Sequence, residues 1–464
     1  MLVRFQVTNV FSFKDPATLS LVGTKERRHA ERVFEHGQPA VKLLPVMALF
    51  GQNGSGKSNL YRGLRFLQRL LLKQPANPEE RIAVPFFRLD EGESERLPMR
   101  LAIDILPAET AYRLRVEIDH AGIVAEWLEE LRGERILPVY GRTRDTSGRF
   151  EWNIGPLQRR CATADDREFV AFKTRDTWSN QLFLSVLRGK GIGVIDEVTA
   201  WFTDQLALMV PDSTLKLLEF KLPTNQGLLE FCNEALRLSG TGIHALQPEE
   251  IAWADFPVSD ETKEELGKKL AEGQGTFVRS PEGRRFSVTR SAGRLVVHRL
   301  FTVHQSRGGR LVRFELSSES EGAQRLLDLL PAFFELVQSG RRRVFFIDEL
   351  DRSLHSLLAR HLLQSFLARL EPGARRQLIF TTHDVTLLDQ DLLRRDEIGF
   401  VQKNPYGESA LLPLATVAGV RYDKDIRKAY LAGEFGAVPC FPGPLFPLPP
   451  PDAGRPGYEQ PPKA

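Results

Sequence analysis

Gly51-Gln52-Asn53-Gly54-Ser55-Gly56-Lys57-Ser58 is the stretch that decides the fold, because it matches the eight-residue phosphate-binding loop at every fixed position. An apolar run of the buried-strand type, residues 43–50, precedes it, and leucines recur at helical spacing from Leu60 to Leu71. A Gly-rich turn that arises by chance is not expected between such a strand and such a helix. The stretch therefore predicts a loop that opens a helix N-terminus and binds phosphate.

The residue types of this loop predict separate roles. Glycines let backbone N–H groups curl around phosphate oxygens, and Lys57 can reach the β- and γ-phosphates of a nucleotide. The hydroxyl of Ser58 suits Mg²⁺, so Ser58 is also a predicted metal ligand. The predicted nucleotide-binding residues of this region are Gly51, Asn53, Gly54, Ser55, Gly56, Lys57, Ser58 and Asn59.

Composition excludes several classes of protein. The 464 residues are 42% hydrophobic and 27% charged, as in ordinary soluble proteins, and the net charge of +3 is too small to indicate a protein that coats nucleic acid. Any such contact would need a local patch, for which Arg341-Arg342-Arg343 and Arg307 with Arg310 are candidates, although short arginine clusters are commonly solvated surface.

The cysteines and the apolar segments indicate the compartment. Cys161, Cys232 and Cys440 are odd in number and far apart, which favours neither a disulfide framework nor a zinc site. The N-terminus lacks the zones of a signal peptide, and no apolar run reaches membrane-spanning length. We therefore expect a cytoplasmic protein without a membrane partner.

The pattern of apolar and polar residues predicts an α/β fold in four parts. Residues 1–136 would form the first half of a nucleotide-binding head with an antiparallel β subdomain, and residues 137–290 a mostly helical insertion. Residues 291–438, where helix and strand alternate, would complete a mixed, doubly wound sheet. Residues 439–464 hold ten prolines and predict either a disordered tail or a proline ligand for a partner.

The strands predicted in the second half of the head carry polar residues at their carboxyl ends. Residues 343–349 form an apolar strand that ends in Asp348 and Glu349. At the carboxyl end of a strand beside the phosphate loop, Asp348 would hold Mg²⁺ and Glu349 would act as the base that polarises water; the alternative is that the pair caps the next helix. One βα unit later His383 follows another apolar strand, where it could contact the γ-phosphate or the attacking water.

A second helix start lies between the insertion and these acids. Ser320 and Gly322 open an amphipathic helix, so its N–H groups and the serine hydroxyl form an anion site, although alone this pattern is also that of an ordinary N-cap. Phosphate loop, Ser-x-Gly helix start, Asp-Glu strand and Thr-Thr-His follow one another in the order found in ATP-binding-cassette (ABC) ATPases. The chain resembles that superfamily.

The resemblance is closer to the stand-alone AAA-family ATP-binding proteins of abortive-infection and anti-phage modules, including RloA-like and AbiL-like proteins, which are related to RecF and SMC ATPase heads. It rests on residues 9–14, 50–57, 319–327, 346–355 and 379–384, and on the closing segments 392–396 and 430–439.

This resemblance implies a head that binds ATP with Mg²⁺ and dimerises on it. Ser320 and Gly322 would contact a γ-phosphate in trans, and Asp351 would lie on the loop that communicates between the two sites. Ser12 and Phe13 match positions that flank the nucleotide in RecF-like relatives. Two features depart from the pattern of the family. Residues 84–89 contain no lid-loop glutamine, and the signature reads Ser-Glu-Gly in place of Ser-Gly-Gly. The insertion also lacks the sustained heptads of a coiled-coil arm.

Two functions remain open from the sequence. One is the ATPase subunit of a two-component defence module that controls a separate effector, in the family a nuclease, because the chain has too little sequence beyond the core for an effector domain of its own. The alternative is a RecF-like ATPase that acts directly on DNA in repair. A transporter ATPase would need a membrane partner, for which the sequence gives no support.

Overall fold

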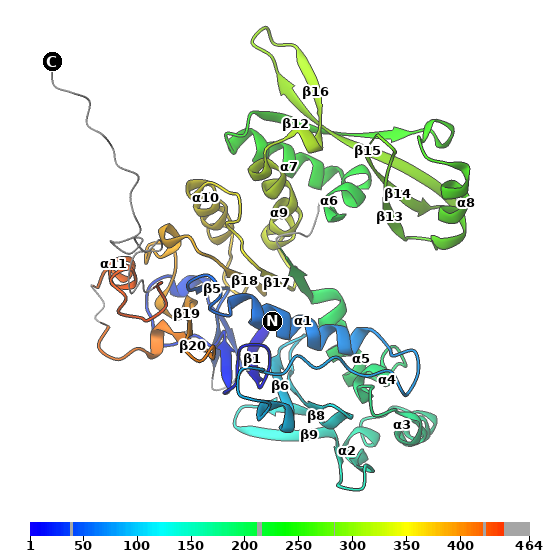
Figure 1. Cartoon of the computed structure of the whole chain (residues 1–464), viewed down its shortest axis with the longest axis vertical. Coiled ribbons are helices and arrows are strands. Elements are labelled where there is room, and N and C mark those ends of the chain that lie inside the picture. Colours follow the sequence, from blue (N-terminus) through cyan, green and yellow to red (C-terminus); the bar gives the residue numbers. More distant parts are fainter. Residues whose placement is uncertain (38–39, 211–215, 283, 421–423, 440–464) are drawn as a thin grey trace, which may run out of the picture.

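The computed structural model describes residues 1–37, 40–210, 216–282, 284–420 and 424–439 (Figure 1). The Pro-rich tail predicted from residue 439 onward lies outside the described residues except for Pro439, and so does Cys440.

A six-stranded sheet forms the centre of the molecule, with the strand order β11-β17-β18-β5-β19-β20. Neighbouring strands from β11 to β19 run parallel, and β20 returns antiparallel to β19. The strands are β5 (Val46–Phe50), β11 (Leu206–Met209), β17 (Arg343–Ile347), β18 (Arg376–Thr381), β19 (Ile398–Lys403) and β20 (Ser409–Pro413). The four inner strands are almost wholly buried, and each contains a run of consecutive apolar residues.

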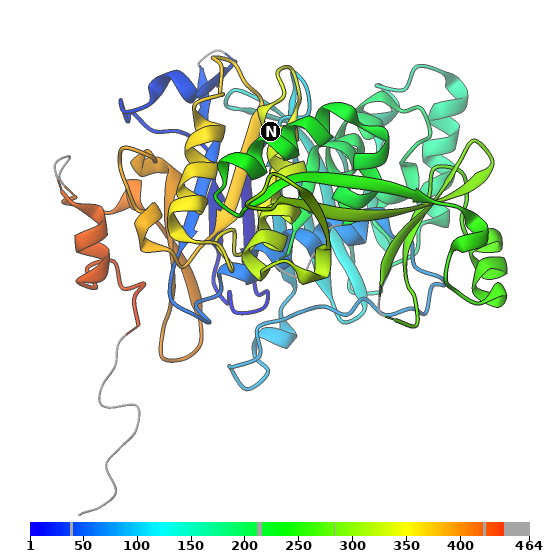
Figure 2. The same cartoon turned by 90° about the horizontal axis from the view of Figure 1, so that it is seen from above.

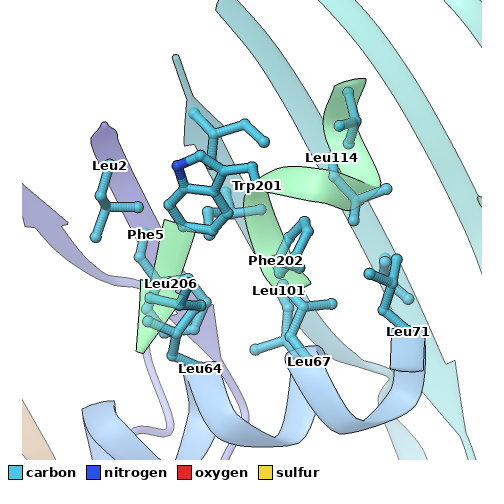
Figure 3. Packing of buried hydrophobic residues seen from close by; sticks show 14 of the residues in the cluster. Leu2, Phe5, Leu64, Leu67, Leu71, Leu101, Leu114, Trp201, Phe202 and Leu206 are labelled. Carbon is cyan, nitrogen blue, oxygen red and sulfur yellow. The ribbon is translucent and has the colours of Figure 1, made fainter. Parts of the chain in front are cut away.

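Helices cover both faces of this sheet. On one side lie α9 (Glu321–Val337) and α10 (Ser356–Leu367), which stand in front of the strands in Figure 2. On the other side lies α1 (Lys57–Leu72), whose leucines at helical spacing are fully buried. Figure 3 shows Leu64, Leu67 and Leu71 of α1 packed with Trp201, Phe202 and Leu206. The apolar stripe predicted from the sequence is therefore the face that joins the phosphate-loop helix to the core.

A seven-stranded antiparallel sheet packs on the far side of α1, in the order β10-β9-β8-β7-β6-β1-β2. Its strands are β1 (Leu2–Thr8), β2 (Ala17–Ser20), β6 (Met99–Ile105), β7 (Ala111–Asp119), β8 (Gly122–Arg132), β9 (Arg135–Arg144) and β10 (Phe150–Asn153). A small hairpin, β3 (Phe34–His36) with β4 (Val41–Leu43), and the helix α11 (Ile426–Leu431) complete the head. This is the ABC-type P-loop NTPase head, a mixed sheet with an antiparallel β subdomain, that the sequence predicts.

One buried glutamine joins the two large sheets. Gln377 of β18 accepts a hydrogen bond from the Leu2 amide (2.6 Å) and donates to the carbonyls of Leu2 (3.0 Å) and Leu44 (2.9 Å). Its side chain therefore satisfies backbone groups where the edges of two sheets meet away from water.

The prediction of a mostly helical segment over residues 137–290 is wrong in part. Residues 137–153 continue the antiparallel sheet as β9 and β10, and β11 belongs to the central sheet. Helices do fill much of the segment, as α2 (Gly155–Gln158), α3 (Ala164–Asp176), α4 (Phe183–Leu187), α5 (Gly193–Ala200), α6 (Lys216–Lys221), α7 (Gln226–Leu238) and α8 (Asp260–Lys269).

A second antiparallel sheet accounts for the remainder of the difference. It has the order β12-β15-β14-β13, with β16 paired to β15, and it contains β12 (Ile243–Ile251), β13 (Gly275–Arg279), β14 (Arg285–Ser291), β15 (Arg294–Gln305) and β16 (Leu311–Glu315). The strands β15 and β16, predicted to begin the second half of the head, thus belong to this sheet. Pro248 and two acids interrupt the strand pattern of β12, and β13 is mostly half-exposed, so the alternation that marks a strand is weak in both.

Across the described ranges, no helix combines the length and the apolar character that crossing a membrane requires.

Candidate functional site

The phosphate loop lies between β5 and α1, at the carboxyl edge of the central sheet. Gly56, the residue before α1, has a φ of 110°, and a Cβ there would overlap the hydroxyls of Ser409 and Ser12. A Cβ on Gly51 would overlap the Val401 carbonyl. Both positions therefore require glycine. Gly56 requires it because of its positive φ and its close neighbours, and Gly51 because the backbone packs closely against it.

Lys57 is buried at the first position of α1. Its Nζ donates to the carbonyls of Gly51 (2.7 Å) and Gln52 (3.1 Å), and it lies 3.4 Å from Nδ1 of His383. Burial lowers the pKa of Lys57 to about 8, against the attraction of Asp348, Asp351 and Glu349. An ammonium held by carbonyls in a partly dry site is well placed to turn toward an incoming phosphate.

Asp348, one residue beyond the end of β17, accepts two hydrogen bonds at the same oxygen. Ser58 donates to Asp348 Oδ1 over 3.0 Å and Thr381 donates to it over 2.7 Å. The side chains predicted to hold Mg²⁺, Ser58 and Asp348, are therefore in contact, although they lie 290 residues apart. The oxygen donor set of hydroxyl and carboxylate is the kind that Mg²⁺ prefers.

Glu349 is held in an unusual backbone conformation. Its φ is 50°, in the left-handed region that non-glycine residues seldom adopt. Its amide donates to the Thr381 hydroxyl (2.7 Å), and its carbonyl accepts from the buried guanidinium of Arg325 (2.8 Å). Contacts on both sides of the residue stabilise a strained conformation that directs the carboxylate to the cleft.

His383 lies opposite the phosphate loop. Its amide donates to Asp351 (3.2 Å), and its ring nitrogen faces Lys57. Burial, and then the charge of Lys57, lower the pKa of His383, so the imidazole is neutral at pH 7. A neutral imidazole can either donate or accept a hydrogen bond.

These residues line one cleft of about 560 Å³. The structure brings together the following lining residues: Asn53, Gly54, Ser55, Gly56, Lys57, Ser58, Asn59, Arg62, Glu349, Asp351, Arg352 and His383. Asp348 lies at its base, in contact with Ser58.

Ser320 and Gly322 lie in a different cleft, of about 570 Å³, that shares no lining residue with the first. Ser320 is the N-cap of α9, where its hydroxyl accepts from the Ala323 amide (3.2 Å). A Cβ on Gly322 would lie 2.7 Å from the Ser353 carbonyl. The loop of residues 351–355 lines both clefts in turn, with Asp351 in the first and Ser353 in the second.

Ser12 and Phe13 do not line the cleft. Phe13 is fully buried in the hydrophobic core, because the turn after β1 directs its ring inward. Ser12 lies behind the phosphate loop, where its hydroxyl accepts a hydrogen bond from Asn59 (2.8 Å). These two positions support the loop from behind.

Ser409, the first residue of β20, belongs to a chain of hydrogen bonds beside Gly56. Its hydroxyl lies 2.6 Å from the Ser55 carbonyl and 2.7 Å from the Ser12 hydroxyl. A carbonyl can only accept, so the single proton of Ser409 goes to Ser55, and Ser12 must donate to Ser409. The bonds therefore run in one direction, from Asn59 through Ser12 and Ser409 to Ser55.

Sequence patterns did not identify Ser409, Thr381, Arg325, Arg62 or Arg352 as site residues. Thr381 precedes the predicted histidine and could have been found as a hydroxyl at the end of a strand. Arg325 lies within the quoted signature helix, and Arg352 follows Asp351 directly. Ser409 carries no local signal, since it reaches the loop only through the pairing of β19 and β20.

The fold and this site define the chain as a P-loop nucleotide-binding head of the ATPase class. A family described as "AAA domain, putative AbiEii toxin, Type IV TA system" matches residues 46–207 and 232–389, which is more than half of the chain. The chain belongs to this family.

Two solved structures give weaker similarity. The SMC head domain from Thermotoga maritima shares 14% identity over 89% of this chain and 98% of its own, with a TM-score of 0.33. An SMC head bound to the C-winged helix domain of ScpA shares 12% identity over 89% of this chain and 96% of its own, with a TM-score of 0.41. No curated protein matches the chain.

The site fits a nucleotide with Mg²⁺. Lys57 and the loop amides would hold the phosphates, and Ser58 with Asp348 would hold the cation. The Ser55 hydroxyl is buried without a hydrogen-bond partner inside the loop, as expected of a binding loop whose polar groups face a ligand.

We expect Ser409→Ala to weaken ATP binding about fivefold, because the loss of one hydrogen bond of about 1 kcal/mol loosens the phosphate loop. Isothermal titration calorimetry with ATP and Mg²⁺ measures the change. Ser287→Ala, which removes a buried serine hydroxyl from the second antiparallel sheet, should leave the affinity unchanged. An equal loss of affinity in both variants would contradict a specific role for Ser409.

ATP binding should weaken as the pH rises above about 8. Phosphate stabilises the ammonium form of Lys57 and raises its pKa in the complex, so the affinity is fully present below about pH 8 and falls by up to about tenfold per pH unit above it. Calorimetry in two buffers with different ionisation enthalpies should detect proton uptake on binding at about pH 9. Lys57→Met should bind weakly and without proton uptake; uptake that persists in this variant would assign the titration to another group.

Proposed function

We propose that this chain hydrolyses ATP to ADP and phosphate, with Mg²⁺, in composite sites formed when two copies associate head to head. The observation that carries the proposal is the separation of the two clefts. Lys57, Glu349 and His383 line one, while Ser320 and Gly322 line another that shares no lining residue with it. A second copy that presents its α9 N-terminus to the first cleft would complete the site.

The residues of the cleft support separate roles in the hydrolysis of ATP. Bound Mg²⁺ would supply a positive charge that neutralises the phosphate oxygens. Lys57 would exchange its carbonyl partners for phosphate oxygens, and Glu349 would accept the proton of the attacking water on its carboxylate. Neutral His383 would orient that water or the γ-phosphate through a ring nitrogen. The amides of the loop and of the partner's α9 would stabilise the developing negative charge.

The loop between the clefts supports coupling between the two sites. Glu349 and Ser353 both have positive φ values, of 50° and 60°. Asp351 holds the His383 amide in one cleft, while the Ser353 hydroxyl donates to Glu321 at the start of α9. A contact made by the partner at α9 would therefore change the position of the residues that bind the γ-phosphate.

At the level of biology, we propose a cytoplasmic sensor or regulatory subunit of an anti-phage, abortive-infection module that controls a separate effector, a nuclease in the first instance. The family description, which names a toxin and a TA system, supports a role in such a module. This ATP-dependent homo-oligomer would hold the effector and release or activate it.

The alternative is a RecF- or SMC-like ATPase that acts directly on DNA. Of the two arginine clusters that would favour it, Arg341-Arg342-Arg343 is largely engaged within the chain. Arg342 pairs with Glu109 (3.6 Å) and Arg343 with Glu335 (2.6 Å). Charges that are already paired give little attraction for phosphates, so the regulatory role remains the first proposal.

Glu349→Gln should leave ATP binding intact, slow hydrolysis by at least about 100-fold, and accumulate an ATP-bound dimer, because only the proton acceptor is lost. Phosphate release and size-exclusion chromatography with light scattering measure the two effects. Adding Ser320→Arg should abolish the dimer while each copy still binds ATP. Hydrolysis by Glu349→Gln at the parental rate would exclude Glu349 as the base, and a dimer that survives Ser320→Arg would exclude the trans contact.

A further inference from the structure

The hairpin of β15 and β16 ends in an open strand edge. In the part of the chain that the structure describes, β16 pairs with β15 alone, from Phe301 opposite Glu315 to Gln305 opposite Leu311. Figure 1 shows this hairpin extending away from the rest of the molecule at the top of the view. An unpaired edge of this kind is a template for another strand.

The side chains of this edge are apolar and exposed. Leu311 is 57% exposed, Val312 37% and Phe314 44%. Natural edge strands are usually protected by proline, a bulge or an inward-pointing charge, and the five residues of β16 contain no proline and pair with β15 in unbroken register. Such concentrated apolar exposure is typical of a surface that another chain covers.

The backbone groups of β16 are also available. The Ser306 amide donates to the Arg310 carbonyl (2.8 Å), which makes these two residues a hydrogen-bonded pair at the hairpin end. Hydrogen-bonded and non-hydrogen-bonded pairs alternate along an antiparallel ladder. Leu311 and Arg313 therefore direct their N–H and C=O groups to the open edge, where an added strand would bind them.

The charge around this edge is mostly positive, because Glu315 at the end of β16 pairs with Arg299 of β15. Residues 305–314 contain Arg307, Arg310 and Arg313 and no acidic residue. Arg313 makes a surface pair with Glu249 at 3.5 Å, while Arg307 and Arg310 have no ion pair among the described residues. Arg307 and Arg310 are one of the two candidate nucleic-acid patches named from the sequence.

When two β16 strands pair antiparallel and are centred on Arg313, the two copies of this arginine lie opposite each other, which disfavours a second copy as the occupant.

We propose that β16 is a docking edge at which an extended, acidic segment of a partner protein adds as a strand of the second antiparallel sheet. Main-chain hydrogen bonds would give affinity, and alternate apolar residues of the segment would cover Val312 and Phe314. Its acids, on the other face, would pair with Arg313, and Arg310 would add positive charge at the hairpin end. A nucleic acid would match the arginines but would leave the apolar side chains and the backbone edge unused.

The docking edge leads directly to the signature helix. The Phe314 ring packs 5.0 Å from the His304 ring, and His304 Nε2 lies 2.8 Å from Glu319, the residue before Ser320. Thr302 of β15 also donates to Glu319. If the proposed function holds, a segment on β16 would therefore contact the same side chains that position the signature, which is how an effector could respond to ATP.

Fluorescence anisotropy with the full chain tests the docking edge. The probe is a labelled peptide of about ten residues in which valine and glutamate alternate, the pattern of a strand with one apolar and one acidic face. Wild-type protein should bind it, and a peptide with lysine in place of glutamate, or with central prolines, should bind at least about tenfold more weakly. The measurement does not depend on hydrolysis, so Lys57→Ala protein should bind the peptide equally well.

Two kinds of variant locate the binding. Arg310→Glu with Arg313→Glu reverses the charge, and Leu311→Pro removes an outward N–H at a position where an edge strand tolerates proline. Both should weaken binding at least about tenfold, whereas Arg279→Glu on β13, a different edge strand of the same sheet, should not.

No binding to the wild type, or binding that neither variant weakens, would overturn the proposal while leaving the ATPase function intact. Duplex DNA that binds in place of the peptide, and is lost with the double arginine variant, would instead make the edge a nucleic-acid surface.

Discussion

One oxygen of Asp348 accepts hydrogen bonds from Ser58 and Thr381, and this contact joins the ends of three neighbouring parallel strands. β5 delivers the phosphate loop, β17 delivers the acids, and β18 delivers Thr381 and then His383. Parallel strands end at the same edge of a sheet, so the pairing of buried apolar strands is what creates the site. The antiparallel sheet and α1 then fix the loop from the other side, through the core residues of Figure 3.

The same geometry supports the proposal that a second copy completes the site. The signature helix α9 packs against the central sheet, and its first turn opens into a cleft of its own. Arg325 of this helix donates to the Glu349 carbonyl, so the helix that would bind a partner's nucleotide also holds the residue proposed as the base of its own copy. The second antiparallel sheet reaches the same helix through Glu319. Nucleotide, partner copy and docking edge would thus act on one structural element.

The central sheet could be predicted from the sequence because buried parallel strands carry strong local patterns, and the candidate site residues were chosen by their place next to those strands and to the phosphate loop. Lys57, Asp348, Glu349 and His383 each follow or precede an apolar run, and the structure brings them together. Of the second antiparallel sheet, β15 and β16 were predicted as strands but assigned to the head. β12 and β13 were missed because Pro248 interrupts β12 and β13 is short and half-exposed. Ser409 could not be found, because its role depends on a contact between segments about 350 residues apart in sequence.

Mixing two inactive variants tests the composite site most directly. Lys57→Ala keeps the signature and loses the phosphate loop, while Ser320→Arg keeps the phosphate loop and loses the signature. If the sites form in trans, each variant alone is inactive, and the mixture contains heterodimers with one intact site, so ATP hydrolysis returns. A mixture that stays as inactive as its components, under conditions where the wild type dimerises and hydrolyses ATP, would contradict the account.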